Sequence, residues 1–234
     1  MEQKDGESLA AYCRAVLPLA DFQPGEASYY RSLPLCVIDA VFSIGSHYVA
    51  TRNTVQRFCA HFALESGNPR HPEPAPDQLS IQDFLAIYTQ YGVEGMAGQV
   101  YQNRQRTSTR NGILKAEAAL YFAEAIAAFD VDRFEHVARI FENEAFEARI
   151  KQIPGQRSGI SLRYFYMLIG SQDYIKPDRM ILRFLQAALD RTPGLQEAHD
   201  LVVVASMILR AEYPYLTPAA LDHLIWAYQR EAKP

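Results

Sequence analysis

Apolar residues recur at steps of three and four along almost the whole sequence, and this helical spacing limits the fold more than any other feature. One such stripe joins Leu35, Ile38 and Phe42, and the segment 115–129 is rich in alanine, leucine and glutamate, which favour helices. No segment alternates apolar and polar residues around a turn dipeptide, as a β-hairpin would. The apolar run at Leu201 is the one candidate strand, and it continues at helical spacing. The sequence therefore predicts an all-α fold.

Composition and cysteine content exclude several classes of protein. With 49% apolar and 21% charged residues, the 234-residue chain can bury a core and is not disordered throughout. No apolar run approaches the roughly 20 residues of a membrane span, and the first ten residues lack the apolar core of a secretory signal. Three cysteines without a CxxC pair exclude a disulfide framework, a four-cysteine zinc site and an iron–sulfur cluster held by four thiolates. We expect a cytoplasmic protein with no membrane contact.

The charge is distributed unevenly along the chain. The net charge of −4 argues against a protein that coats nucleic acid without regard to sequence. Nevertheless, residues 102–115 hold four bases and no acid, and residues 151–183 hold six bases and two acids. The intervening segment 117–147 holds eight acids and two bases. The two basic segments would form one surface if the fold brought them together; the alternative is that these charges are scattered and solvated.

One segment is predicted to be a loop, and a helix is predicted to follow it. Residues 67–78 contain prolines at positions 69, 72, 74 and 76, which cannot propagate a helix. Ser80 is a candidate N-cap for the next helix, with Asp83 in its first turn.

The segment from residue 150 to residue 185 carries the most chemical information. It contains a turn at Pro154-Gly155, a helix, and then Asp178 at the start of another helix. A glycine-bearing turn before a helix leaves unpaired backbone N–H groups at the N-terminus of that helix, and such groups suit a phosphate. Arg157, beside the turn, could add a charge-assisted contact to the same phosphate.

These residues resemble the helix-hairpin-helix DNA glycosylases of the endonuclease III-like superfamily. The family pattern is an Ile-Pro-Gly turn followed by a lone aspartate at a helix start, here Gly155 and, 23 positions later, Asp178. Three further segments resemble family elements in the family's order: residues 33–58, 111–120 and 221–230. The resemblance covers roughly residues 30 to 230.

The resemblance implies a two-lobed, all-α glycosylase-like fold with an interlobe cleft that accepts duplex DNA. The helical barrel lobe would span residues 31–172 and include the hairpin, and the second lobe would comprise residues 1–30 and 173–234. Hairpin amides would grip a phosphate, the target nucleotide would be flipped out, and an aspartate would assist cleavage of the glycosidic bond. The activity implied is that of a DNA N-glycosylase in base-excision DNA repair, a hydrolase without lyase activity.

Carried over residue by residue, the resemblance makes Asp178 the catalytic carboxylate. Breaking the C1′–N bond builds positive charge on the sugar, and a fixed carboxylate stabilises that charge. The alternative for Asp178 is a helix N-cap. The candidate DNA contacts are Gly155, Gln156, Arg157, Ser158 and Gly159 in the turn and the bases Arg104, Arg106, Arg110 and Lys115. The candidate pocket or wedge residues are Ser43, Gly45, Ser46 and His47.

The sequence also departs from the family pattern. Arg157 stands where the second hairpin glycine is expected, although Gly159 could take over its backbone role. Gly159 stands where bifunctional members carry the lysine that forms a Schiff base, so lyase activity is not expected. Gly45 replaces the usual wedge glutamine. No cluster cysteines follow Trp226, so we expect no iron–sulfur cluster, no other metal centre and no cofactor. A monovalent cation at the hairpin is the one group left open.

Two other interpretations remain. The chain could be a non-catalytic DNA- or protein-binding module that retains the glycosylase fold, which the altered hairpin and the negative net charge favour. It could also be an unrelated helical protein. The sequence does not identify the base or lesion, and it leaves the oligomeric state open, with a monomer as the expectation.

Overall fold

The computed structural model describes residues 2–22, 29–68 and 78–231, and in these ranges the chain is predominantly helical, which confirms the all-α prediction. The exception is a short antiparallel pair of strands, β1 (Tyr29–Tyr30) and β2 (Gly67–Asn68). The prolines of the predicted loop lie at positions outside the described residues. No helix in the described part of the chain is both long enough and apolar enough to cross a membrane.

The chain divides into two compact units. Unit 1 comprises residues 1–26 and 170–234, and unit 2 comprises residues 27–169. The resemblance placed the boundaries between the two lobes after residue 30 and after residue 172.

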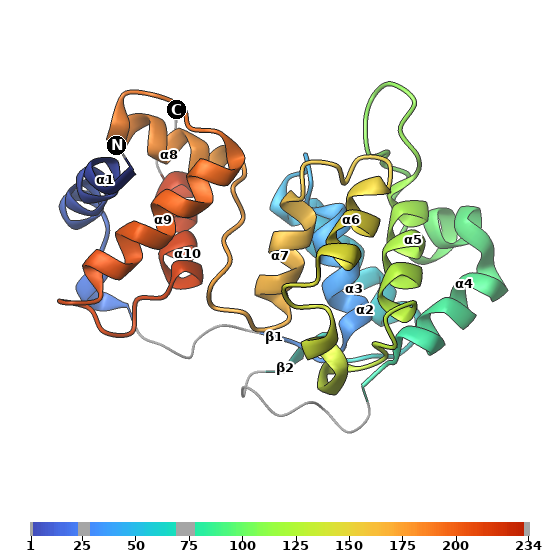
Figure 1. Cartoon of the computed structure of the whole chain (residues 1–234). Helices are drawn as coiled ribbons and strands as arrows, with labels where there is room; N and C mark the ends of the chain where they lie inside the picture. Colours follow the sequence, from blue (N-terminus) through green and yellow to red (C-terminus); the bar gives the residue numbers. More distant parts are fainter. Residues whose placement is uncertain (1, 23–28, 69–77, 232–234) are drawn as a thin grey trace. The chain divides into compact units, whose positions relative to one another are not determined.

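Unit 2 is built around α2 (Leu33–Phe42), in which every residue is buried. This helix packs against four other helices of the unit, and Figure 1 shows it among the helices of that unit. The remaining helices of unit 2 are α3 (Tyr48–His61), α4 (Ile81–Gly95), the π-helical turn η2 (Met96–Val100), α5 (Lys115–Ala127), the 3-10 turn η3 (Phe134–Arg139), α6 (Glu144–Gln152) and α7 (Ile160–Leu168). α3, α4, α5 and α7 contact α2 directly.

Local capping sets the starts of two helices in unit 2. Ser80 Oγ accepts from the Asp83 amide at 3.0 Å, and the Asp83 carboxylate accepts from the Ser80 amide, so a complete capping box starts α4. The predicted N-cap at Ser80 is thereby confirmed. Asn143 caps α6 by accepting from the Phe146 amide at 3.1 Å.

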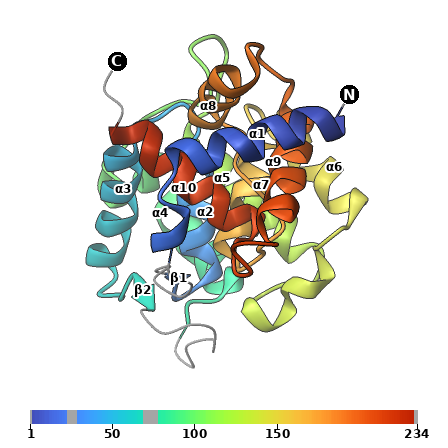
Figure 2. The same ribbon diagram turned by 90° about the vertical axis from the view of Figure 1, so that its left-hand side faces the viewer.

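Unit 1 consists of α1 (Glu2–Val16), the 3-10 turn η1 (Leu19–Asp21), α8 (Arg179–Leu189), α9 (Leu195–Leu209) and α10 (Pro218–Glu231). The apolar run at Leu201 lies in α9, which confirms the helical interpretation. Helices α1 and α9 lie against each other (Figure 2). Their close approach depends on Gly6, because a Cβ at that position would overlap the Val204 side chain.

Candidate nucleic-acid interface

A tight turn joins α6 to α7 at the predicted hairpin position. The Gln156 amide donates to the Ile153 carbonyl at 2.9 Å, and the Gly159 amide donates to the Gln156 carbonyl at 3.0 Å. Gly155 and Gly159 adopt left-handed backbone conformations, with φ of +87° and +74°. Arg157 is outside the left-handed region. An arginine at this position therefore costs the turn no backbone strain, because the two left-handed positions both fall on glycines.

The basic loop formed by residues 102–114 lies against this turn. A Cβ at Gly155 would overlap the side chain of Thr107, so the Thr107 side chain packs directly on the backbone of Gly155. The loop folds back on itself through bonds from the Thr107 amide to the Ile113 carbonyl at 2.9 Å and from the Lys115 amide to the Gln105 carbonyl at 2.8 Å. Figure 1 shows this loop beside the connection between α6 and α7. The fold thus brings the loop and the turn, one from each basic segment, side by side.

The arginines of the basic loop and of the turn are exposed, but they differ in their contacts. Arg104 is paired with Glu94 at 2.5 Å in an exposed ion pair, which contributes little to stability. Arg106 donates to the Gly112 carbonyl at 2.6 Å and so stiffens the loop. Arg110 and Arg157 are exposed. Among the described residues, the arginines at positions 106, 110 and 157 form no ion pair with an acidic side chain.

Lys115 is buried, whereas the sequence predicted that it would contact DNA at the surface. Its side chain is only 4% exposed, and its ammonium group donates to the Phe42 and Ile44 carbonyls at 2.9 and 2.7 Å. It also reaches Ser46 Oγ at 2.7 Å and Gln105 Oε1 at 3.2 Å. This burial removes the ammonium group from any surface that a phosphate could reach. Lys115 instead closes the C-terminal end of α2, where a cation is favourable.

The candidate pocket or wedge loop, residues 43–47, is attached to the basic loop. Ser46 Oγ donates to Gln105 Oε1 at 2.8 Å, whereas Ser43 Oγ donates to the Ala40 carbonyl within its own helix end. Gly45 has φ of +64°, and a Cβ there would meet no atom within 4 Å, so it lies at an open tip. His47 occupies the N-cap position of α3 without a side-chain capping bond.

Two apolar residues beside this loop were missed by the sequence analysis. Tyr48 and Val49 begin α3 with 49% and 55% of their surfaces exposed, so two adjacent large apolar side chains lie outside the core. The signal was present, because they follow a glycine-bearing loop directly and stand outside the buried stripe of α3 at Thr51, Val55 and Phe58. Their position makes them candidates for contact with a base or a sugar.

Several buried polar atoms gather around the turn without hydrogen-bond partners. Thr107 Oγ1, Gln156 Oε1 and Ser161 Oγ are all buried, and none has a partner among the described residues. Buried polar groups of this kind are rare, because leaving one unpaired costs about 1–3 kcal/mol. Since the Gln156 side chain is buried, only its backbone could contact DNA as predicted.

The contact between the turn and the loop predicts unequal effects of two glycine substitutions. Gly155→Ala should destabilise unit 2 by roughly 2–4 kcal/mol, because left-handed backbone strain is added to an overlap with Thr107. Gly159→Ala is the matched control, since its Cβ would lie 3.4 Å from Lys151 Cε and only the strain of about 1–2 kcal/mol remains. Urea unfolding measures both. Equal losses would show that the loop does not pack on the turn.

A second buried cluster was not predicted from the sequence. The Asp39 carboxylate, in the middle of α2, accepts from Tyr30 Oη at 2.8 Å and from Tyr164 Oη at 3.2 Å. Burial, with the charge of Asp39 added to it, raises the pKa of both tyrosines well above the usual value. The sequence signal is a lone acid within the apolar stretch 33–42, and its role here is to link β1 and α7 to α2.

Asp178 lies in unit 1 at the N-cap of α8. Its Oδ1 accepts from the Met180 amide at 2.8 Å and from the Ile181 amide at 3.5 Å. The capping alternative raised from the sequence is thereby confirmed. The carboxylate is half-buried, and its second oxygen is not part of the cap.

A second carboxylate lies close to Asp178. Asp222, on α10, is 7% exposed and accepts from the Lys176 amide at 3.0 Å. Burial raises the pKa of Asp222 to about 7, and the negative charge of Asp178 contributes to the shift. Asp222 was not among the site residues predicted from the sequence, because its burial depends on packing between distant segments.

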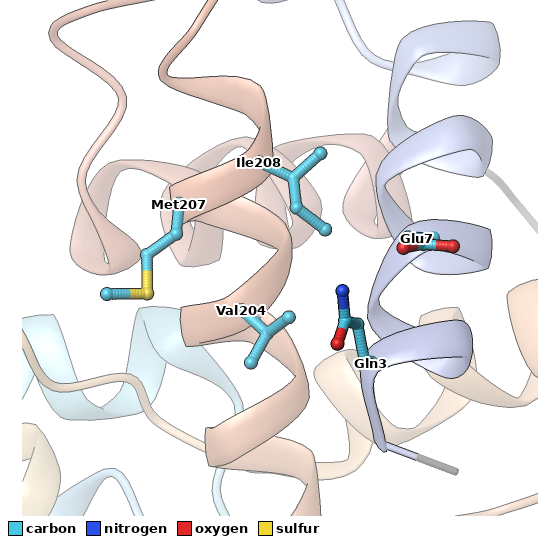
Figure 3. A pocket seen from close by; sticks show the side chains of 5 residues that line it. All are labelled: Gln3, Glu7, Val204, Met207 and Ile208. Atoms are coloured by element: carbon cyan, nitrogen blue, oxygen red, sulfur yellow. The ribbon is translucent and has the colours of Figure 1, made fainter.

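The hollow between α1 and α9 is lined by few groups that could take part in a reaction (Figure 3). Gln3 and Glu7 line it from α1, and Val204, Met207 and Ile208 line it from α9. Among the described residues that line it, Glu7 is the only one with an ionisable side chain. Within residues 2–22, 29–68 and 78–231, no group of three or more His, Cys, Asp or Glu side chains could hold a metal ion.

Comparison with known proteins gives one match. No curated protein and no solved structure matches the chain. Residues 7–230 match the family described as Domain of unknown function (DUF8548), and these residues include α7, α8 and nearly all of both units. The chain therefore belongs to the DUF8548 family.

Proposed function

We propose that this chain is a DNA glycosylase-like protein that excises a base from duplex DNA, with a fold of the helix-hairpin-helix glycosylase type. The observation that carries the proposal is the packing of the basic loop against the glycine turn between α6 and α7. This packing puts the loop that carries the exposed Arg106 and Arg110 beside the turn that carries the exposed Arg157.

The turn and the loop are suited to bind the phosphate backbone. The first N–H groups of α7 have no intrahelical acceptors, although the Ile160 amide donates to Ser158 Oγ at 3.5 Å, and the helix dipole favours an anion at this end. The guanidinium groups of Arg157, Arg106 and Arg110 add charge-assisted hydrogen bonds to phosphate oxygens. Neither contact reads the sequence of the bases, so the site would position DNA and leave specificity to other residues.

Asp178 supplies the carboxylate for the chemistry in this proposal. Cleavage of the glycosidic bond leaves positive charge on the sugar, which an ionised carboxylate stabilises while the base departs and water attacks C1′. The cap bonds to Met180 and Ile181 fix one carboxylate oxygen in place. Gly159 carries no amine, so no Schiff base forms and the product is an intact strand with an abasic site.

A monovalent cation at the turn belongs to the proposal only as an accessory group. Gln156 Oε1 is a buried oxygen without a hydrogen-bond partner among the described residues, and it is the type of donor that such a cation takes. A bound cation would neutralise charge next to the phosphate.

The direct test is excision of a base from labelled duplexes. Duplexes that carry deaminated, alkylated or oxidised bases are incubated with the full chain and then treated with alkali. The proposal expects strand breaks that appear only after the alkali step, at the position of one class of modified base. Absence of breaks across all classes, with DNA binding intact, would favour the non-catalytic alternative, which the complete N-cap role of Asp178 supports.

DNA binding itself predicts a change in salt dependence. Replacing both Arg106 and Arg157 with alanine should weaken binding to unmodified duplex and reduce the slope of log K against log salt by about 1 to 2, since each phosphate contact contributes about 0.9. Arg133→Ala, in the acidic segment, is the matched control and should leave the slope unchanged. Fluorescence anisotropy across a salt series measures it. Equal slopes for all three proteins would contradict the assigned surface.

A further inference from the structure

We propose that Asp222 is a positioning residue that holds the backbone segment carrying Asp178 in place. This inference rests on the proposed function, because it concerns the carboxylate to which that function assigns the chemistry. Asp222 does not contact the substrate in this scheme. It acts through the backbone of Lys176, whose N–H bonds to Asp222 and whose carbonyl accepts from the Asp178 amide.

The hydrogen bonds of Lys176 link Asp222 to Asp178. The Lys176 amide donates to Asp222 Oδ1 at 3.0 Å, and the Lys176 carbonyl accepts from the Asp178 amide at 2.6 Å. Ile175 and Pro177, on either side of Lys176, are buried. The segment that precedes α8 is already held to α10 by the bond from the Ala219 amide to the Gln172 carbonyl at 3.1 Å, and the bond to Asp222 adds a tie immediately before Asp178.

The electrostatic surroundings of Asp222 make this tie sensitive to pH. Burial is the largest cause that raises the pKa of Asp222 to about 7, and the charge of Asp178 raises it further. The bond from the Lys176 amide and the charge of the Lys176 ammonium oppose this shift. Although α8 and α9 pack against α10, neither contributes a further charge to the shift. Asp222 is therefore ionised above pH 7, where it accepts more strongly from the Lys176 amide.

Activity measurements separate the hydrogen bond from the charge. Asp222→Ala removes the acceptor and should slow single-turnover excision at pH 8 on the order of 10- to 100-fold, since misplacing a catalytic group by about 1 Å can have an effect of this size. Asp222→Asn keeps an oxygen acceptor and should restore most of the rate. The asparagine variant should also lose the rise in rate that the wild type shows between pH 6 and pH 8. His223→Ala, an exposed neighbour on α10, is the matched control.

A stability measurement gives a readout that does not depend on excision. Because the folded-state pKa of Asp222 lies above its ordinary value of 3.8, its contribution to stability is complete below about pH 3.8 and is lost as the pH rises through about 7. Asp222→Asn should therefore raise Tm relative to the wild type at pH 8 but not at pH 4. In NMR spectra, the Lys176 amide should titrate with a midpoint near pH 7 in the wild type and not in the asparagine variant.

The outcomes distinguish this inference from the proposed function. If the wild type excises a base and Asp222→Ala does so at the same rate, the positioning role is wrong and the proposed function stands. If the wild type excises nothing, the proposed function fails, and a Lys176 amide that titrates near pH 7 still supports the tie. A Lys176 amide that does not respond to pH or to either substitution overturns the inference.

Discussion

Replacing Asp178 with asparagine is expected to lower base excision by roughly 10²- to 10⁴-fold, the usual contribution of a positioned carboxyl group. The same change should leave the free energy of unfolding within about 0.5 kcal/mol of the wild type, because asparagine and aspartate are nearly equal as N-caps. Asparagine can still accept from the Met180 and Ile181 amides, but it carries no charge to stabilise the developing cation. The substitution therefore separates the two roles that the geometry allows.

Two further variants at position 178 complete the test. Asp178→Ser keeps a capping oxygen without a carboxylate and should match asparagine in both activity and stability. Asp178→Ala removes the cap as well and should lose a further 1 kcal/mol or so of stability. Single-turnover excision and urea unfolding are measured on all three proteins. Full activity in the asparagine variant would mean that Asp178 is only a cap and that the chemistry requires another group.

The features that were predictable from the sequence are those that depend on local spacing. The stripe of α2, the helical run through Leu201 and the capping box of Ser80 and Asp83 each involve residues within one or two turns of one another. The glycine turn before α7 is local in the same sense. For such elements, backbone conformation and side-chain pattern point to the same structure, and no knowledge of the distant chain is needed.

The parts of the site that were not predictable depend on contacts between distant segments. Thr107 lies beside Gly155, and Asp222 accepts from the Lys176 amide, although 46 residues separate the members of the second pair. A basic residue near a loop was naturally assigned to the surface, yet Lys115 is buried. A single sequence does not show which of several equally basic positions the packing will enclose. Charge patterning therefore located the basic loop but not the role of each residue in it.

Replacing Lys115 with methionine is expected to destabilise unit 2 strongly, although the substitution leaves no cavity. Methionine fills a similar volume but donates no hydrogen bond, so the Phe42 and Ile44 carbonyls lose the donor. Each buried acceptor left unpaired costs about 1–3 kcal/mol, so the two carbonyls together imply a loss of roughly 2–6 kcal/mol. Urea unfolding monitored in unit 2 measures this loss, and hydrogen exchange at residues 43–47 should become faster because Ser46 also loses its contact.

The same substitution at an exposed lysine provides the control. Lys151 forms an ion pair with Glu147 one turn away at 3.1 Å, and Lys151→Met should cost only about 0.3–0.5 kcal/mol. The two variants remove the same charge from the same unit, so a general effect of net charge would destabilise both equally. A small effect at Lys115 would mean that water reaches the C-terminal end of α2 and satisfies its carbonyls. In that case the ammonium group would be accessible from the solvent, and the phosphate contact first expected for Lys115 would again become physically reasonable.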